Sequence, residues 1–173
     1  MQARDFSWAV SAAVWVALTA CNTSAERVEP WREPEKTKWE EAETALPTAL
    51  PLASDLIEFE VRRRDRGSFF VDRAHLVVGP DGITRLALIS QSVSGARSAT
   101  YEGFRCATGE NRLYAIAGDD GWSEPRTSVW RDVPNSSFDP RSVLMQDFLC
   151  DATTPRSPEQ VVQRLRYPKP DWR

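Results

Sequence analysis

Five residues in the middle of the chain have side chains that could form a binding site. Tyr101, Glu102 and Arg105 lie close together, and Trp122 and Trp130 follow downstream. An aromatic ring, a carboxylate and a guanidinium at this spacing can line a pocket for a polar ligand. They can equally form a core network in which Arg105 pairs with Glu102, since buried charges are normally paired. We favour the core network.

Candidate catalytic groups are sparse. The single histidine, His75, is not accompanied by a Gly-x-Ser-x-Gly nucleophile motif, so we interpret it as structural. Asp72 and Glu102 could act as a carboxylate pair in glycoside hydrolysis, but that depends on a separation which the sequence does not define. Asp119-Asp120-Gly121 is typical of a turn and lacks the ligand spacing of a calcium loop. We therefore assign no catalytic residue, metal ligand or cofactor.

The chain also contains a basic cluster: Arg62, Arg63, Arg64 and Arg66 precede a glycine. Such a cluster could bind phosphate or an anionic polymer of the cell envelope. We favour a solvated turn. The chain as a whole also carries no strong basic excess that would neutralise nucleic-acid phosphates. We expect no nucleic-acid partner.

Two of the three cysteines, Cys106 and Cys150, belong to the folded part of the chain. One lies on a predicted strand and the other at the end of a predicted helix. In an oxidising compartment, the simplest interpretation is a structural disulfide that joins the helix to the sheet. A redox-active pair would be expected to show a C-x-x-C motif, and a zinc site would need more ligands.

The elements that position these residues are mostly strands. Alternating apolar residues predict a strand near 56–61, and Pro80-Asp81-Gly82 between two β-rich runs predicts a hairpin. Further strands are expected at 99–107 and 112–117, with a short one at Val129-Trp130. Two helices should follow, one capped by Asp139 and one beginning at Ser157 in a capping box. This order predicts an α+β fold: an antiparallel sheet of about five strands with two C-terminal helices on one face and one disulfide.

The N-terminal residues have the character of a targeting segment. An apolar run from Phe6 to Ala20 has the length of a signal-peptide core and is too short for a stable membrane span. Leu18-Thr19-Ala20-Cys21 resembles the lipobox of bacterial lipoproteins, which implies cleavage before Cys21 and lipidation of its sulfur. Asn22 in the next position then favours the outer membrane. Cleavage after Ala25 would instead release a soluble periplasmic protein.

Composition divides the remaining chain. Residues 22–53 contain seven Glu and four Lys or Arg with several prolines, whereas residues 54–173 have a net charge of zero. We expect a signal peptide at 1–20, an acidic tether at 21–53, a domain at 54–167 and a tail at 168–173. Residues 35–43 could form helical turns. We expect a partly helical arm whose tryptophans, Trp31 and Trp39, dock on the domain or on a partner.

One block of the domain resembles a known family. The order Phe69-Phe70-Val71-Asp72, Tyr101-Glu102-Gly103-Phe104-Arg105-Cys106 and Asp147-Phe148-Leu149-Cys150 is similar to that of the CNP-like (cryptic neisserial protein) family. The resemblance covers about residues 46–166. It implies a compact exported domain of the proteobacterial envelope and no defined activity or ligand.

Together these observations support one functional hypothesis and two alternatives. We predict a non-catalytic lipoprotein of the outer membrane that faces the periplasm and binds an envelope partner. The alternatives are an envelope hydrolase with an unrecognised acid–base pair and a periplasmic carrier of a small ligand.

Overall fold

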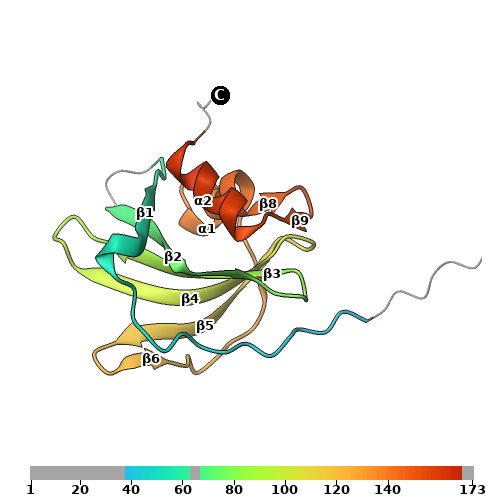
Figure 1. The fold of residues 1–173 in the computed structure, drawn as a ribbon, viewed down its shortest axis with the longest axis horizontal. Helices are drawn as coiled ribbons and strands as arrows, with labels where there is room; N and C mark the ends of the chain where they lie inside the picture. The colour runs from blue at the N-terminus through green and yellow to red at the C-terminus, as the bar shows by residue number, and fades with distance from the viewer. Residues whose placement is uncertain (1–37, 63–66, 169–173) are drawn as a thin grey trace, which may run out of the picture. The chain divides into compact units, whose positions relative to one another are not determined.

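The structure, a computed structural model, describes residues 38–62 and 67–168. Within these residues, an antiparallel seven-stranded sheet forms the centre of the fold (Figure 1). Its strands follow one another along the chain as a meander, with β7 paired to β5 beside β6. The strands are β1 (Leu56–Phe59), β2 (Ser68–Val78), β3 (Ile83–Gln91), β4 (Arg97–Arg105), β5 (Glu110–Gly118), β6 (Gly121–Ser123) and β7 (Arg131–Asp132).

The hairpin between β2 and β3 forms where the sequence predicts it. The amide of Gly79 donates to the carbonyl of Ile83 at 2.9 Å, and Gly82 has a φ of 75°, which a glycine adopts without strain. The strand β2 is longer than either apolar run that precedes the turn. An irregularity between Asp72 and Val77 interrupts its pairing with β3 and displaces His75 from the regular ladder.

Three helical segments follow the sheet: α1 (Pro140–Val143), the π-helical η3 (Leu144–Leu149) and α2 (Pro158–Arg166). The side chain of Asp139 caps α1 by accepting from the amides of Arg141 and Ser142. At the start of α2, the capping box between Ser157 and Gln160 is complete. Both predicted helix starts are therefore confirmed. A second, two-stranded sheet of β8 (Cys150–Asp151) and β9 (Thr154–Pro155) connects η3 to α2.

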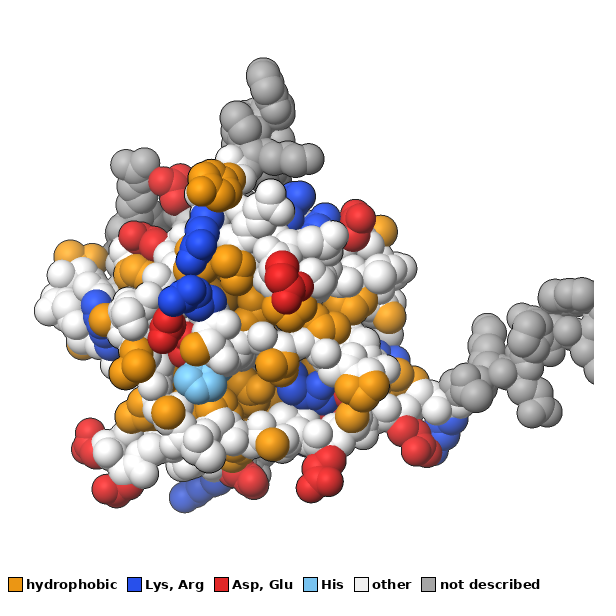
Figure 2. Space-filling view, in the orientation of Figure 1, with side chains coloured by type: hydrophobic (Ala, Val, Ile, Leu, Met, Phe, Trp, Pro, Cys, Tyr) orange, Lys and Arg blue, Asp and Glu red, His pale blue; other side chains and the backbone are white. Residues whose placement is uncertain are grey.

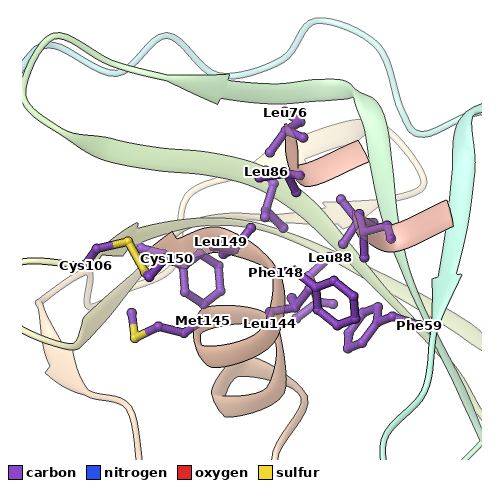
Figure 3. Close-up of a cluster of buried hydrophobic side chains, with 14 of the residues drawn as sticks. Phe59, Leu76, Leu86, Leu88, Cys106, Leu144, Met145, Phe148, Leu149 and Cys150 are labelled. Atoms are coloured by element: carbon purple, nitrogen blue, oxygen red, sulfur yellow. A yellow bond between two sulfur atoms is a disulfide. The ribbon is translucent and has the colours of Figure 1, made fainter. Parts of the chain in front are cut away.

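The main core fills the space between the helices and one face of the sheet, which we call the helix face (Figure 3). Phe104 and Leu86 of the sheet and Leu144 of η3 are fully buried there. The ring of Phe59 packs against that of Phe148, with centroids 6.0 Å apart. Burial of such a side chain contributes about 1.5–3 kcal/mol, so this cluster supplies much of the stability of the fold.

The predicted disulfide is present. Cys106, directly after β4, bonds to Cys150 at the end of η3, with Cα atoms 5.6 Å apart. Figure 3 shows the bond beside Met145, at one edge of the apolar cluster. It therefore joins the helical layer to the sheet.

A second, smaller cluster lies on the opposite side of the sheet, which we call the second face. It contains Ala87 of β3, Tyr101 of β4 and Tyr114 of β5, with Leu46 packed against them. Residues 38–52, which we call the arm, precede β1 in the chain and run along this face (Figure 1). No helix or strand is assigned within the arm, so its backbone pairs with no strand of the sheet.

Several sequence-based expectations differ from the structure in detail. The main sheet has more strands than the five expected, because β6 and β7 add short pairings at the β5 edge. The short strand lies at Arg131–Asp132 instead of at Val129-Trp130. The described part of residues 35–43 is not helical, because its side chains and backbone bind the second face. The compact unit begins at Lys38, earlier than the boundary at residue 54 that composition indicates.

Some predictions fall outside the described residues. These are the signal peptide, Cys21, the cleavage site after Ala25, Trp31, most of the arginine cluster and the end of the tail. Within the described residues, no helix combines the length and apolar character that a membrane crossing requires. Figure 2 shows acidic and basic side chains interspersed over the visible face, in keeping with the neutral composition of the domain.

Candidate binding groove on the second face of the sheet

The most concentrated polar constellation of the second face surrounds Glu41 of the arm. Tyr114 Oη donates to one carboxylate oxygen at 2.5 Å, and Arg112 Nη1 donates to the other at 2.6 Å. Trp130 Nε1 donates to that second oxygen at 3.0 Å. Tyr114 and Arg112 project from β5, and Trp130 lies just before β7. These donors form a receptor for a carboxylate.

A second group of contacts holds the arm by its backbone. The carboxylate of Asp81, in the β2–β3 turn, accepts from the amide of Ala42 at 2.9 Å. Asp81 also forms an ion pair with Arg85 of β3 at 2.7 Å, and the side chain of Arg85 is only 6% exposed. Arg85 in turn donates to the hydroxyl of Thr44 at 2.8 Å and to the carbonyl of Ala42 at 3.4 Å. The pair therefore binds both a donor and an acceptor of the extended chain.

Aromatic contacts occur at both ends of the arm. The guanidinium of Arg105 lies 3.8 Å from the ring centre of Trp39, a close cation–π contact. Trp39 Nε1 donates to the carbonyl of Asp81 at 3.0 Å, and its ring packs edge-on against Trp130. Near the other end, Trp122 Nε1 donates to the carbonyl of Ala49 at 2.9 Å. The arm is thus bound along most of its length.

Tyr114 reaches Glu41 through a slot formed by Gly103. A Cβ atom built on Gly103 would lie 2.5 Å from Cε2 of Tyr114 and 2.7 Å from its hydroxyl oxygen. Both distances are too short for real atoms, so a side chain at this position would displace the ring. The absence of a side chain at Gly103 therefore sets the position of the Tyr114 hydroxyl.

The electrostatics of the groove favour a bound carboxylate. Burial opposes ionisation of Glu41, but hydrogen bonds from Tyr114 and Trp130 and the charge of Arg112 outweigh it, so its pKa lies below 4.5. Burial raises the pKa of Tyr114, and its hydrogen bond to Glu41 raises it further. The tyrosine therefore remains protonated and the glutamate ionised, as a donor–acceptor pair requires.

Beside Glu41 the groove opens into a hollow of about 440 Å³. Thr44, Arg112, Tyr114, Pro125 and Ser128 are among the residues that line it. The Ser128 hydroxyl accepts from Arg112 Nε at 2.8 Å, which holds the guanidinium in place. The arm therefore leaves part of the groove unfilled.

The five residues that the sequence singles out divide between the two faces. Tyr101 and Trp122 pack together on the second face with ring centres 6.1 Å apart, and Trp130 binds Glu41 nearby. Glu102 points to the helix face instead, because adjacent strand residues alternate. Arg105 lies on the second face, against Trp39. The predicted site thus contains four residues of the groove, the three aromatic residues and Arg105, but not its carboxylate.

The predicted pairing of Arg105 with Glu102 is wrong. Glu102 is fully buried and binds Arg141, whose Nη2 and Nε lie 2.6 Å and 2.8 Å from the two carboxylate oxygens. Thr100 and Asn111 also donate to Glu102, at 2.7 Å and 3.1 Å. Arg105 lies three positions along β4, on the opposite face, where it pairs with Glu110 at 3.4 Å. Strand alternation separates the two side chains.

The remaining catalytic candidates are likewise separated. The cross-strand pairs Asp72–Ala87 and Ala87–Tyr101 place Asp72 on the second face, opposite Glu102, so these carboxylates do not face each other. The fully buried Asp72 binds Nδ1 of His75 at 2.5 Å instead. Among residues 38–62 and 67–168, no cluster of three His, Cys, Asp or Glu side chains could hold a metal ion.

The residues most important to the groove were not identified from the sequence. Glu41 lies in a segment whose composition is typical of a tether, Asp81 belongs to a turn motif, and Arg85 and Arg112 lie within predicted strands. The sequence does single out Trp39, since a tryptophan is unusual in a solvated linker, and of the two expected outcomes the structure shows Trp39 docked on the domain. Its separation from Glu41 by one residue places both side chains on the same side of an extended chain.

These features define a class of protein: a disulfide-linked α+β domain whose meander sheet carries helices on one face and an N-terminal segment on the other. The chain belongs to the CNP1-like family, whose model matches residues 34–166. The matched region includes the whole arm, so the arm is part of the family's domain. No curated protein and no solved structure matches the chain.

Proposed function

We propose that the chain is an exported lipoprotein of the bacterial outer membrane, anchored through Cys21, whose periplasmic domain binds a partner without catalysing a reaction. The observation that carries the binding role is the convergence of Arg112, Tyr114 and Trp130 on one carboxylate. Protonated and cationic donors in fixed positions are suited to recognising an anion, and charge-assisted hydrogen bonds of this kind are strong.

Two features support export. The Cys106–Cys150 disulfide is a bond that persists in oxidising compartments such as the periplasm. The sequence Leu18-Thr19-Ala20-Cys21 follows an apolar run of signal-peptide length. Because an extended chain spans at most about 3.6 Å per residue, a lipid on Cys21 would keep Lys38 within about 60 Å of the membrane.

The anchor is tested with the full chain and a Cys21→Ser variant, each expressed with a radiolabelled fatty acid. We expect the wild-type chain to incorporate label and to sediment with outer membranes, and the variant to do neither. Label that persists in the variant would exclude lipidation at Cys21. Soluble wild-type protein beginning at Glu26 would instead identify cleavage after Ala25.

The binding role is tested by crosslinking in intact cells, followed by identification of the captured protein. Photocrosslinkers placed at the exposed Glu40 and Glu43, next to the groove, should capture a defined partner. A crosslinker at the exposed Thr153, in the turn between β8 and β9, serves as a comparison outside the groove. Failure to capture a partner at saturating crosslinking from the groove would contradict the proposed role.

A hydrolase is the second candidate, and the Asp72–His75 pair is the observation that favours it. A buried carboxylate that binds Nδ1 of a partly exposed imidazole orients the ring as a general base requires. The purified protein would be assayed against ester and cell-wall glycan substrates. Turnover that is lost in His75→Asn would support a hydrolase; its absence in the wild-type chain would exclude these activities.

A further inference from the structure

The arm binds the second face as a peptide ligand binds a groove. Its backbone has no ladder of hydrogen bonds to the sheet. It is held by contacts to individual backbone groups, at Ala42 and Ala49, and by pockets for the side chains of Trp39 and Glu41. Recognition of an extended segment commonly combines main-chain hydrogen bonds with pockets for alternate side chains.

Three arginines lie beneath the arm, and two of them also pair with acidic residues of the domain, Arg85 with Asp81 and Arg105 with Glu110. Arg85, Arg105 and Arg112 all contact the arm, and the side chain of Arg85 is 6% exposed with the arm in place. The arm presents Glu41 at the centre of these charges and the ring of Trp39 to Arg105. Charge and aromatic complementarity therefore define what the surface selects: an extended acidic segment with an aromatic residue two positions before a carboxylate.

We propose that the second face is a binding groove for an acidic, extended peptide segment of a partner protein, and that the arm occupies it as an intramolecular ligand. This inference rests on the proposed binding role and names its site and the chemistry of its partner. The partner segment displaces residues 38–50 and places a carboxylate between Arg112, Tyr114 and Trp130. The unfilled hollow beside Glu41 gives an incoming segment a point of entry.

Because the arm already occupies the groove, a partner segment must bind tightly enough to compete with it. The arm leads into β1 through only Ala53–Asp55, and a short connection of this kind gives an intramolecular ligand an effective concentration in the millimolar range or above. A free peptide with the same sequence would therefore compete poorly against the wild-type arm. A chain whose arm is weakened should bind the same peptide well, because the groove itself is unchanged.

The experiment uses the full chain and a synthetic peptide of residues 38–50 carrying a fluorophore. Fluorescence anisotropy would be measured with the wild-type chain and with a Trp39→Ala/Glu41→Ala arm variant. We expect the arm variant to bind at least about tenfold more tightly than the wild-type chain, since charge-assisted hydrogen bonds hold the native arm. Adding Arg112→Ala to the arm variant should return its affinity for the peptide to that of the wild-type chain or below.

Matched controls separate recognition from general attraction. A peptide with Glu41→Gln should bind the arm variant about tenfold more weakly, whereas one with Glu43→Gln should bind normally, because Glu43 is exposed. Circular dichroism and urea unfolding would establish that the arm variant is folded; if it is not, the single Glu41→Gln chain takes its place.

Two results would overturn the inference: a folded arm variant that does not bind the peptide, or binding that is insensitive to Glu41→Gln in the peptide. Either would show that the arm is a structural strap. Neither would affect the lipid anchor or a partner that binds elsewhere, which acyl labelling and crosslinking in cells test independently.

Discussion

The carboxylate of Glu41 and the hydroxyl of Tyr114 lie 2.5 Å apart, although 73 residues separate them in the chain. Their contact joins the arm to the middle of the sheet. It depends on Gly103, because the Tyr114 ring crosses β4 in the space that a side chain there would fill. Substitutions on the sheet should therefore alter the arm without changing any residue of it.

Gly103→Ala should loosen the arm. The added methyl group displaces the Tyr114 ring from Glu41, at a cost of about 1–3 kcal/mol, as is typical of overpacking. Urea unfolding would measure the stability of the domain. Hydrogen exchange at the Ala42 amide, which donates to Asp81, would measure how often the arm detaches. Gly118→Ala is the matched control, because its Cβ would meet only the Gly121 carbonyl oxygen at 3.8 Å. Unchanged exchange at Ala42 would contradict the role of the slot.

Arg141→Ala should destabilise the domain by about 3 kcal/mol, since it leaves the buried carboxylate of Glu102 without its counter-charge. The value lies at the lower end for broken buried pairs, because the Arg141 side chain is 36% exposed and water can enter. Urea unfolding provides the measurement. Arg126→Ala, at an exposed position, should change stability by less than about 0.5 kcal/mol. A similarly small effect of Arg141→Ala would show that the hydrogen bonds from Thr100 and Asn111 are enough to stabilise the buried Glu102 carboxylate.

Removing the disulfide should lower the free energy of unfolding by about 4 kcal/mol, because Cys106 and Cys150 close a loop with a sequence separation of 44. The comparison is between wild type and Cys106→Ser/Cys150→Ser in urea, with dithiothreitol added to the wild type as a second route. Cys21→Ser should leave unfolding unchanged. A double variant as stable as the wild type would indicate that packing of η3 alone holds the helical layer.

Stability should fall at acidic pH through the carboxylates that hold the arm. Burial opposes ionisation of Asp81, but hydrogen bonds from Arg85, Ala42 and Ile83 outweigh it and place its pKa below 3.8. The pKa of Glu41 is likewise below its ordinary value of 4.5. A carboxylate whose pKa is lower in the folded than in the unfolded state stabilises the fold at any pH above its unfolded-state pKa. That stabilisation is lost as the pH falls through its folded-state pKa.

The measurement is the free energy of urea unfolding between about pH 6 and about pH 3. The difference between wild type and Glu41→Gln/Asp81→Asn should be largest near pH 6 and should shrink as the pH falls below the unfolded pKa values. Glu43→Gln controls for loss of an arm charge. A difference that stays constant with pH would mean that neither carboxylate contributes through ionisation.

Local sequence signals predict the parts of the fold that depend on neighbouring residues. The turn at Gly79–Gly82 and the capping box at Ser157 need only short stretches of chain, and both are present. Strand periodicity also placed the main strands, apart from the short pairings of β6 and β7, which depend on the β5 edge.

The groove was not predictable in the same way. Its residues come from the arm, the β2–β3 turn, β3, β5 and the segment before β7, and no local pattern relates them. Glu102 illustrates the difficulty, since its partner Arg141 is 39 residues away whereas Arg105 is three. Sequence proximity favoured the wrong arginine, and alternation along β4 excludes it.

The position of the arm has a consequence for how the chain folds. Arg112, Tyr114 and Trp130 follow Glu41 by 71, 73 and 89 residues. Because a chain is synthesised from its N-terminus, Glu41 emerges long before the side chains that bind it. Contacts of such long range form late and slow the folding of a domain. Until β5 and Trp130 have emerged, the Glu41 carboxylate lacks these donors and the arm can be held only by earlier contacts, such as those of the β2–β3 hairpin with Ala42 and Thr44, so full attachment of the arm marks completion of the sheet.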